Sequence, residues 1–372
     1  MHLIVKKNDI INFIELVVMF YILHFSGSIK YIFFVAWISY YLVIYRSIKK
    51  EMLYILLPSL ICIGIGLSLA VFNSLNTIAI KESIFYFLPP FGAICIWKAK
   101  GYKTKNYVDV MFFADLTVFL ITMLPKFNKV DWLESQYAFI IGIYVLYFLF
   151  NHEYKMFFVS LVALILAHKR IAWGGVLIAA ILLFVTYRKR KESSIRDKKK
   201  AIYVVTIVGV LAVAILLVWV YLCSIDAVSM VMMKFHINSQ GRIDQWVKFN
   251  NQYVFSPFYV GHGLGYVTSI IERWGISTYL VFHNDILLMY IQLGFIGFVA
   301  YFYSHFMIVK HYIKHYSLQI QEAMFLITII GYTFICYLTD NISIYINYQF
   351  PFYVIFFSII YEKILNDKNI NN

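Results

Sequence analysis

The chain alternates between long apolar runs and short polar connectors rich in lysine and arginine. A run of about 20 apolar residues is long enough to cross a bilayer as a helix. Windows of about that length predict twelve membrane spans, several of them short. The spans cover approximately 10–26, 29–45, 52–72, 83–97, 107–124, 136–150, 154–168, 170–187, 201–222, 283–303, 321–338 and 342–360. The fourth span contains Pro89-Pro90, which we expect to break or kink its helix.

One long polar interruption, residues 223–282, divides this pattern. Nine predicted spans precede it within residues 1–222, and three follow it within residues 283–372. Only helices or closed barrels satisfy the backbone inside lipid, and the runs have helical length. We therefore expect a single all-α polytopic membrane domain, residues 1–372, of about 12 transmembrane helices with one long extracytoplasmic loop.

Composition and charge agree with this topology and predict its orientation in the membrane. Hydrophobic residues make up 62% of the chain and the mean hydropathy is +0.75, whereas apolar usage in soluble domains is roughly 45–50%. With both termini in the cytoplasm, most of the 32 lysines and arginines fall in inner connectors, as the positive-inside rule requires. The sequence therefore predicts a multi-pass protein of the cytoplasmic (inner) membrane, with its N-terminus and C-terminus cytoplasmic.

The net charge of +13 does not require a nucleic-acid partner. The most basic run, Tyr187 to Lys200, adjoins an apolar span, where lysines contact anionic lipid headgroups. We expect membrane lipids, and no nucleic acid, as partners of these charges.

The cysteines and acidic residues predict no metal site. The four cysteines lack CxxC spacing, and three of them lie inside predicted spans, as apolar filler does. The chain has no D-x-D or HExxH motif. We therefore expect no metal and no cofactor.

In this topology, basic and titratable side chains from three segments lie at the outer face of the membrane. Lys169 and Arg170 open the eighth span, Arg242 lies in the long loop, and His283 opens the tenth span. All four lie at about the depth of the outer lipid headgroups. A site of positive charge is therefore predicted there.

Arg242 leaves two interpretations open. It follows Ser239, a good helix N-cap, so a surface helix is expected in which Arg242 and Trp246 share a face at i, i+4. Such a helix can lie at the interface, with its arginine on lipid phosphate and its tryptophan in the aromatic belt. The same pair can instead face a substrate.

Two further features carry the same ambiguity. Gly261, Gly263 and Gly265 alternate in "GHGLGY", which permits either an anion-binding nest of amides or a simple turn back to the membrane. His283-Asn284 opens an apolar run. This histidine can snorkel at the interface, or serve as a base that titrates near neutral pH.

Asp115 lies in the middle of the fifth span, where an acidic side chain costs about 2.5–3.5 kcal/mol on the insertion scale. It therefore needs a partner. We expect a structural pair with Lys169 or Arg170 and not a proton relay.

Taken in order, four stretches resemble the signature region of the O-antigen ligase and polymerase family, a bacterial polysaccharide polymerase/ligase superfamily. They are "HKRIAWGGVLIAAILLF" (168–184), "GRIDQW", "GHGLGY" and "HNDILLMYIQLGFIGFVAYFY" (283–303). In that family an arginine opens a span, a large outer loop carries a second arginine and a glycine-rich motif, and a His-Asn pair opens the next span ahead of GxxG. The resemblance covers residues 160–303. The matching positions are Arg170, Arg242, Gly261, Gly263, Gly265, His283, Asn284, Gly294 and Gly297.

The resemblance implies a GT-C-like fold and a metal-independent glycosyltransferase. The implied donor is a polyprenyl-diphosphate-linked oligosaccharide, whose anomeric carbon is attacked by a hydroxyl of a lipid-linked acceptor. Arg170 and Arg242 would meet the charge of the leaving diphosphate, since guanidinium groups suit phosphate oxygens. His283 would orient or deprotonate the acceptor hydroxyl. The implied substrate-binding residues are Lys169, which stands where many members have Ser, and Gly261, Gly263, Gly265, Asn284 and Trp246.

Three functions remain to be distinguished. Within the family we favour a polysaccharide polymerase, for O-antigen, capsule or exopolysaccharide, over a ligase that transfers glycan to lipid A core; a related branch glycosylates proteins. The alternative of another class is a flippase for the same lipid-linked sugar. Transporters often show internal repeats and helices broken at mid-membrane, whereas here the polar residues gather on one face. Other polysaccharide-assembly proteins are candidate partners.

Overall fold

A computed structural model describes residues 7–24, 29–44, 50–73, 76–100, 104–123, 135–187, 195–236, 242–274, 282–316 and 318–370. All regular structure in these residues is helical, which confirms the all-α prediction. The helices are α1 (Lys7–His24), α2 (Ile29–Ile44), η1 (Lys50–Leu56), α3 (Leu57–Phe72), α4 (Thr77–Lys100), α5 (Thr104–Met123), α6 (Tyr137–Phe150), α7 (Tyr154–Leu166), α8 (Arg170–Tyr187), α9 (Ile195–Ser224), α10 (Ala227–Lys234), α11 (Arg242–Phe249), η4 (Asn250–Gln252), α12 (Tyr266–Arg273), α13 (Asp285–His315), α14 (Ile320–Tyr337), η5 (Ile342–Ile344) and α15 (Ile346–Ile370).

Every predicted span overlaps a helix of this series, and the spans 52–72 and 342–360 each begin in a 3-10 helix, η1 or η5, and continue in α3 or α15. Within the described residues, six helices are long and apolar enough to cross a membrane by length and composition. They include α13, of 31 residues, and the apolar part of α9. Shorter apolar helices, such as α6 and α7, match the short runs in the sequence. The chain is thus a multi-pass membrane protein, and the number of twelve crossings stays a prediction.

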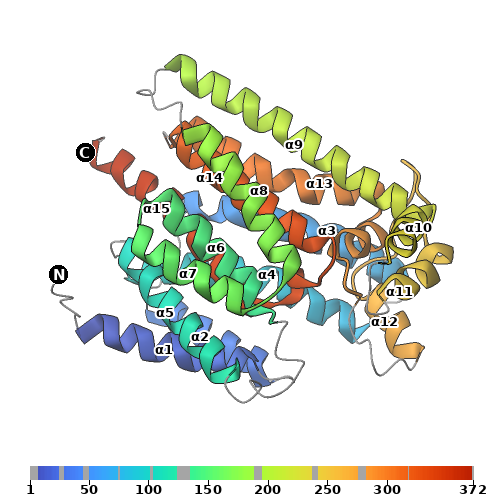
Figure 1. The fold of residues 1–372 in the computed structure, drawn as a ribbon, viewed down its shortest axis with the longest axis horizontal. Helices are drawn as coiled ribbons and strands as arrows, with labels where there is room; N and C mark the ends of the chain where they lie inside the picture. Colours follow the sequence, from blue (N-terminus) through green and yellow to red (C-terminus); the bar gives the residue numbers. More distant parts are fainter. Residues whose placement is uncertain are drawn as a thin grey trace.

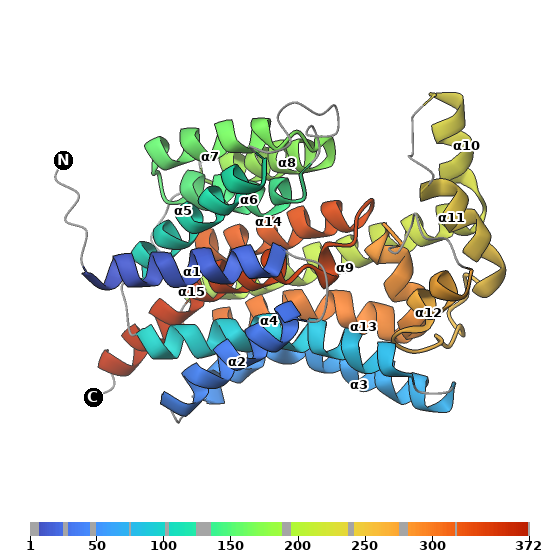
Figure 2. The same cartoon turned by 90° about the horizontal axis from the view of Figure 1, so that it is seen from below.

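The helices form a bundle whose two ends differ (Figures 1 and 2). Helix α1 begins and α15 ends at one end of the bundle. The short helices α10, α11 and α12 of the polar interruption gather at the other end, which we call the loop end. This arrangement is the one that the predicted topology needs, because it separates the termini from the long loop.

The structure differs from two predictions about individual spans. Helix α4 is not broken at Pro89 and Pro90; the helix that is interrupted is α13, whose Gly294 has a left-handed φ of 70°. Among the residues that the structure describes, no basic side chain pairs with Asp115. It accepts a 2.6 Å hydrogen bond from the Tyr144 hydroxyl of α6, a neutral partner on the adjacent helix that avoids burying a second charge.

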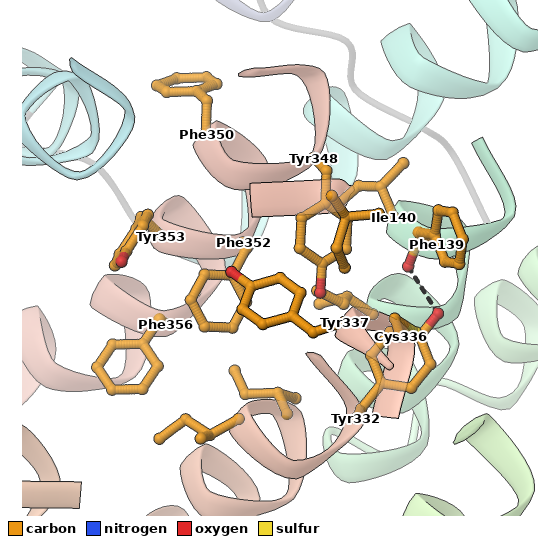
Figure 3. Packing of buried hydrophobic residues seen from close by; sticks show 14 of the residues in the cluster. Phe139, Ile140, Tyr332, Cys336, Tyr337, Tyr348, Phe350, Phe352, Tyr353 and Phe356 are labelled. Atoms are coloured by element: carbon orange, nitrogen blue, oxygen red, sulfur yellow. Dashed lines mark hydrogen bonds between the residues drawn. The ribbon is translucent and has the colours of Figure 1, made fainter. Parts of the chain in front are cut away.

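A buried aromatic cluster packs α6, α8 and α14 against one another (Figure 3). Tyr332 of α14 donates a 2.8 Å hydrogen bond to the Phe139 carbonyl of α6. Its ring fits against two glycines: a Cβ at Gly142 would collide with the Tyr332 hydroxyl, and one at Gly175 of α8 would lie 3.0 Å from the ring. Because α6, α8 and α14 are locked together here, the start of α8 is held beside the end of α14.

The predicted orientation can be tested by cysteine labelling. We expect Asn251→Cys, at the loop end, to react with an impermeant thiol reagent in intact cells, and Lys314→Cys, near the end of α13, to be shielded. The four native cysteines are all buried, so background labelling should be low. Arg190, a third position suited to this test, lies outside the described residues. Labelling of position 314 from outside would reverse the orientation.

Candidate active site

The predicted basic segments meet around a carboxylate, Asp340, in the connector between α14 and η5. Asp340 is 1% exposed. Lys169 Nζ lies 2.5 Å from its Oδ2, and His283 Nδ1 lies 3.5 Å from its Oδ1. Lys169 immediately precedes α8 and His283 precedes α13 by two residues. Segments more than 100 residues apart in sequence therefore contact one acidic group at the loop end.

The charge of Asp340 is stabilised by these contacts. Burial alone would raise the pKa of this carboxyl, because a low dielectric disfavours the ionised form. Hydrogen bonding by His283 and the positive charge of Lys169 outweigh burial and hold the pKa well below its usual range. Asp340 is thus a fixed anion at neutral pH, placed between a lysine and a histidine.

The backbone at His283 is held in an uncommon conformation by the same connector. His283 has a φ of 53°, in the left-handed region that non-glycine residues rarely occupy. Its N–H donates to Asn341 Oδ1. Asp285 receives hydrogen bonds of 2.8 and 2.6 Å from the Ser343 amide and hydroxyl, and one of 3.2 Å from Asn341 Nδ2. The backbone that carries the imidazole is therefore held in place by this network of hydrogen bonds.

Two residues predicted to bind substrate contact the residues that flank His283. Asn284 is the N-cap of α13, and its side chain accepts a 3.0 Å hydrogen bond from the Leu287 amide. Trp246 is only 4% exposed, and its indole donates a 3.0 Å hydrogen bond to the Phe282 carbonyl. With its ring covered, Trp246 is unsuited to stacking on a sugar. Both side chains are thus held against the backbone on either side of His283.

The two arginines differ in their surroundings. Arg242 begins α11, and its Nη1 donates a 3.0 Å hydrogen bond to the Thr339 carbonyl, next to Asp340 in sequence. Its guanidinium is therefore directed at the connector and not solely at lipid. Arg170 begins α8, directly after Lys169, and its side chain is exposed. The structure thus brings Lys169, Arg242 and His283 together, with Arg170 at the rim.

The glycine segment, residues 259–265, is a packing element. A Cβ at Gly261 would collide with the backbone of Gln292 and Gly294, and a Cβ at Gly263 with the backbone of Ala70. Its amides are already used: Gly263 N donates to Gln292 O at 2.8 Å, and Gly265 N donates to Glu82 Oε2 at 2.8 Å. Of the two interpretations that the sequence left open for these glycines, this arrangement favours a close-packed turn over an anion-binding nest.

This segment fits into the break in α13. At Gly294 the helix loses its regular geometry. The amides of His262 and Gly263 then donate to the carbonyls of Ile291 and Gln292, at 3.0 and 2.8 Å. The loop thus completes hydrogen bonds that an unbroken helix would make internally.

Glu82 of α4 is a second acidic residue that sequence reasoning missed. It is 5% exposed and accepts hydrogen bonds from Gly265 N (2.8 Å), Thr268 Oγ1 (2.6 Å) and Gln292 Nε2 (2.8 Å). It therefore ties the glycine segment, α12 and α13 to α4. An acidic residue directly before the fourth predicted span was the available signal, as was Asp340-Asn341 in the connector before the last span.

Comparison with known proteins supports the resemblance noted in the sequence. Residues 156–302 match the family model described as O-antigen ligase, which supports the O-antigen ligase/polymerase superfamily. The matched region contains Lys169, Arg170, Arg242, the glycine segment and His283; Asp340 lies beyond it. No curated protein and no solved structure matches the chain significantly.

Proposed function

We propose that the protein is a polysaccharide polymerase. It transfers glycan from a polyprenyl-diphosphate-linked donor to a sugar hydroxyl of a lipid-linked acceptor, at the outer face of the cytoplasmic membrane. The observation that carries the proposal is the convergence of Lys169, Arg242 and His283 around Asp340 at the loop end. The O-antigen ligase match over the same region supplies the reaction class.

His283 acts on the acceptor in this proposal. Its Nδ1 faces Asp340, which favours the tautomer that carries a proton on Nδ1 and leaves Nε2 as the basic nitrogen. Nε2 accepts the proton of the acceptor hydroxyl as the hydroxyl oxygen forms its bond to the anomeric carbon. Asp340 then stabilises the imidazolium.

The arginines act on the leaving group. As the bond between the anomeric carbon and the phosphate oxygen breaks, the polyprenyl diphosphate takes the bonding electrons and gains negative charge. Arg242 and the exposed Arg170 supply planar donor groups for the phosphate oxygens. Lys169 is reassigned: because its ammonium is 2.5 Å from Asp340, it positions that carboxylate and is not a direct phosphate ligand.

The alternatives use the same site. A ligase would accept the same donor and pass the glycan to lipid A core, and the residues described here would have the same roles. A flippase would move the lipid-linked sugar across the bilayer without forming a bond. We favour the enzyme because Lys169, Arg242 and His283 gather on one side of the bundle, at or just before the first residues of α8, α11 and α13.

The test is glycan elongation by the purified protein in detergent, supplied with one lipid-linked repeat unit. We expect longer lipid-linked glycans to form. Arg242→Lys should fold normally and lose most of this activity, because an ammonium cannot make the bidentate contact of a guanidinium. Lys248→Ala, an exposed change on the same helix α11, is the matched control. Full activity in Arg242→Lys would show that Arg242 serves only lipid or structure, and elongation that requires sealed vesicles would favour a flippase.

A further inference from the structure

A polar cavity of about 570 Å³ opens at the loop end, separate from the residues around Asp340. Its walls come from the end of α3, the start of α4, the glycine segment and α12. Its lining residues do not include Lys169, Arg170, Arg242 or His283, and the proposed mechanism does not use the cavity. Figure 2 shows α12 and the end of α3 close together at this end of the bundle.

One wall is a rigid, flat aromatic pair. The rings of His262 and Tyr266 stack with centroids 4.0 Å apart and an angle of 15° between their planes. Both are tied to one residue: His262 Nε2 donates to the Gln252 carbonyl at 2.9 Å, and the Tyr266 hydroxyl donates to Gln252 Oε1 at 2.9 Å. Because both rings are anchored, the pair offers a preformed surface to the flat C–H face of a ring-shaped ligand.

The rest of the lining mixes hydrogen-bond donors and acceptors. Asn73 uses its Nδ2 on the carbonyls of Leu69 and His262, which leaves its Oδ1 as an acceptor. Asn76 uses its Oδ1 on the Ala79 amide, which leaves its Nδ2 as a donor. Glu272 and Arg273 add one charge of each sign.

This mixture points to hydroxyl groups. A hydroxyl both donates and accepts, so it can pair with either amide group and with either charged residue. A phosphate would find no net positive charge, because Glu272 offsets Arg273, and an acyl chain would leave the polar groups unpaired. The aromatic wall and the mixed polar rim together fit a sugar ring.

We propose that this cavity binds a sugar residue of the glycan chain, away from the anomeric carbon that reacts. The proposal rests on the proposed function and extends it. Binding at a remote sugar would help to position the substrate for transfer. The sugar can belong to the donor's glycan or to the acceptor's glycan, since both have the same chemistry.

The test fills the cavity with Ser269→Trp, a change on α12. The binding probe is the soluble repeat-unit oligosaccharide, released from its lipid carrier and titrated calorimetrically into the purified full chain. We expect Ser269→Trp to bind it about tenfold or more weakly than the native protein. Lys248→Trp, on the exposed face of α11, adds the same side chain outside the cavity and should bind normally.

Transfer kinetics identify the source of the sugar. With a tagged acceptor at fixed concentration and varied donor, and then with the roles reversed, a KM raised in only one series assigns the sugar to that substrate. If Ser269→Trp does not fold, the same binding and KM measurements are made on Arg273→Ala, a milder change at an exposed residue of the cavity. Native binding and native KM values in a folded cavity variant would overturn the proposal. Failure of the native protein to elongate glycans, with oligosaccharide binding still sensitive to Ser269→Trp, would reject the polymerase and keep the sugar site.

Discussion

Replacing His283 by alanine is expected to reduce glycan transfer by about 10²–10⁴-fold, the usual contribution of general acid–base catalysis. The imidazole faces Asp340 through Nδ1 and is held by a backbone with φ of 53°. Removing it leaves the acceptor hydroxyl without a base, whereas Arg242 and Arg170 still meet the diphosphate. Turnover should therefore fall while donor binding persists.

The measurement compares single-turnover rates and donor affinity in the two proteins. His315→Ala is the matched control, because it removes an exposed histidine near the other end of the same helix, α13. Normal turnover in His283→Ala would remove this residue from the mechanism. A loss of donor binding in place of turnover would assign it to the diphosphate.

Asp340→Asn is expected to destabilise the protein and to lower its activity. Removing one partner of a buried ion pair typically costs about 3–5 kcal/mol, and the side chains of Lys169 and Asp340 are only 13% and 2% exposed. The pKa of Asp340 is lowered on folding, so its contribution to stability is present above the unfolded pKa, about 3.9, and is lost as the pH falls below it. The difference in unfolding temperature between native and variant proteins should persist to about pH 5 and narrow in stronger acid.

A double variant separates stability from catalysis. Lys169→Met removes the unpaired charge that Asp340→Asn leaves behind, so the two changes together should recover much of the stability. Activity should stay low, because His283 has lost the carboxylate that orients it. Recovery of both stability and turnover in the double variant would show that Asp340 is structural alone.

Apolar runs predicted the helices well because burial in lipid depends on local composition. The same runs could not show that α4 continues through Pro89 and Pro90, since helix packing decides whether a proline interrupts a helix. Nor could they show the partner of Asp115. Tyr144 is one of several tyrosines in neighbouring spans, and only the packing of α5 against α6 selects it.

The basic residues of the site could be predicted from the sequence, because charged side chains are uncommon in so apolar a chain. Lys169 and His283 are unusual at the ends of apolar runs, Arg242 stands in the long polar loop, and the three do converge. Asp340 was missed because an acidic residue in a short connector is common, and its role depends on a buried position that no local pattern encodes. The glycines were ambiguous for a related reason. Alternate glycines indicate close approach, but the local pattern does not show which segments approach: Gly261 lies against α13, whereas Gly263 and Gly265 lie against α3 and α4, far earlier in the chain.

The break at Gly294 has a consequence for how the protein is assembled in the membrane. The carbonyls of Ile291 and Gln292 lie inside the apolar part of α13, and their hydrogen-bond donors come from residues 262 and 263. Exposed to lipid without those donors, each carbonyl would cost several kcal/mol. Helix α13 therefore reaches its final shape only after the loop has crossed to the side on which that helix begins. We therefore expect α13 to enter the bilayer first as an uninterrupted helix and to acquire its break when residues 262 and 263 dock against it.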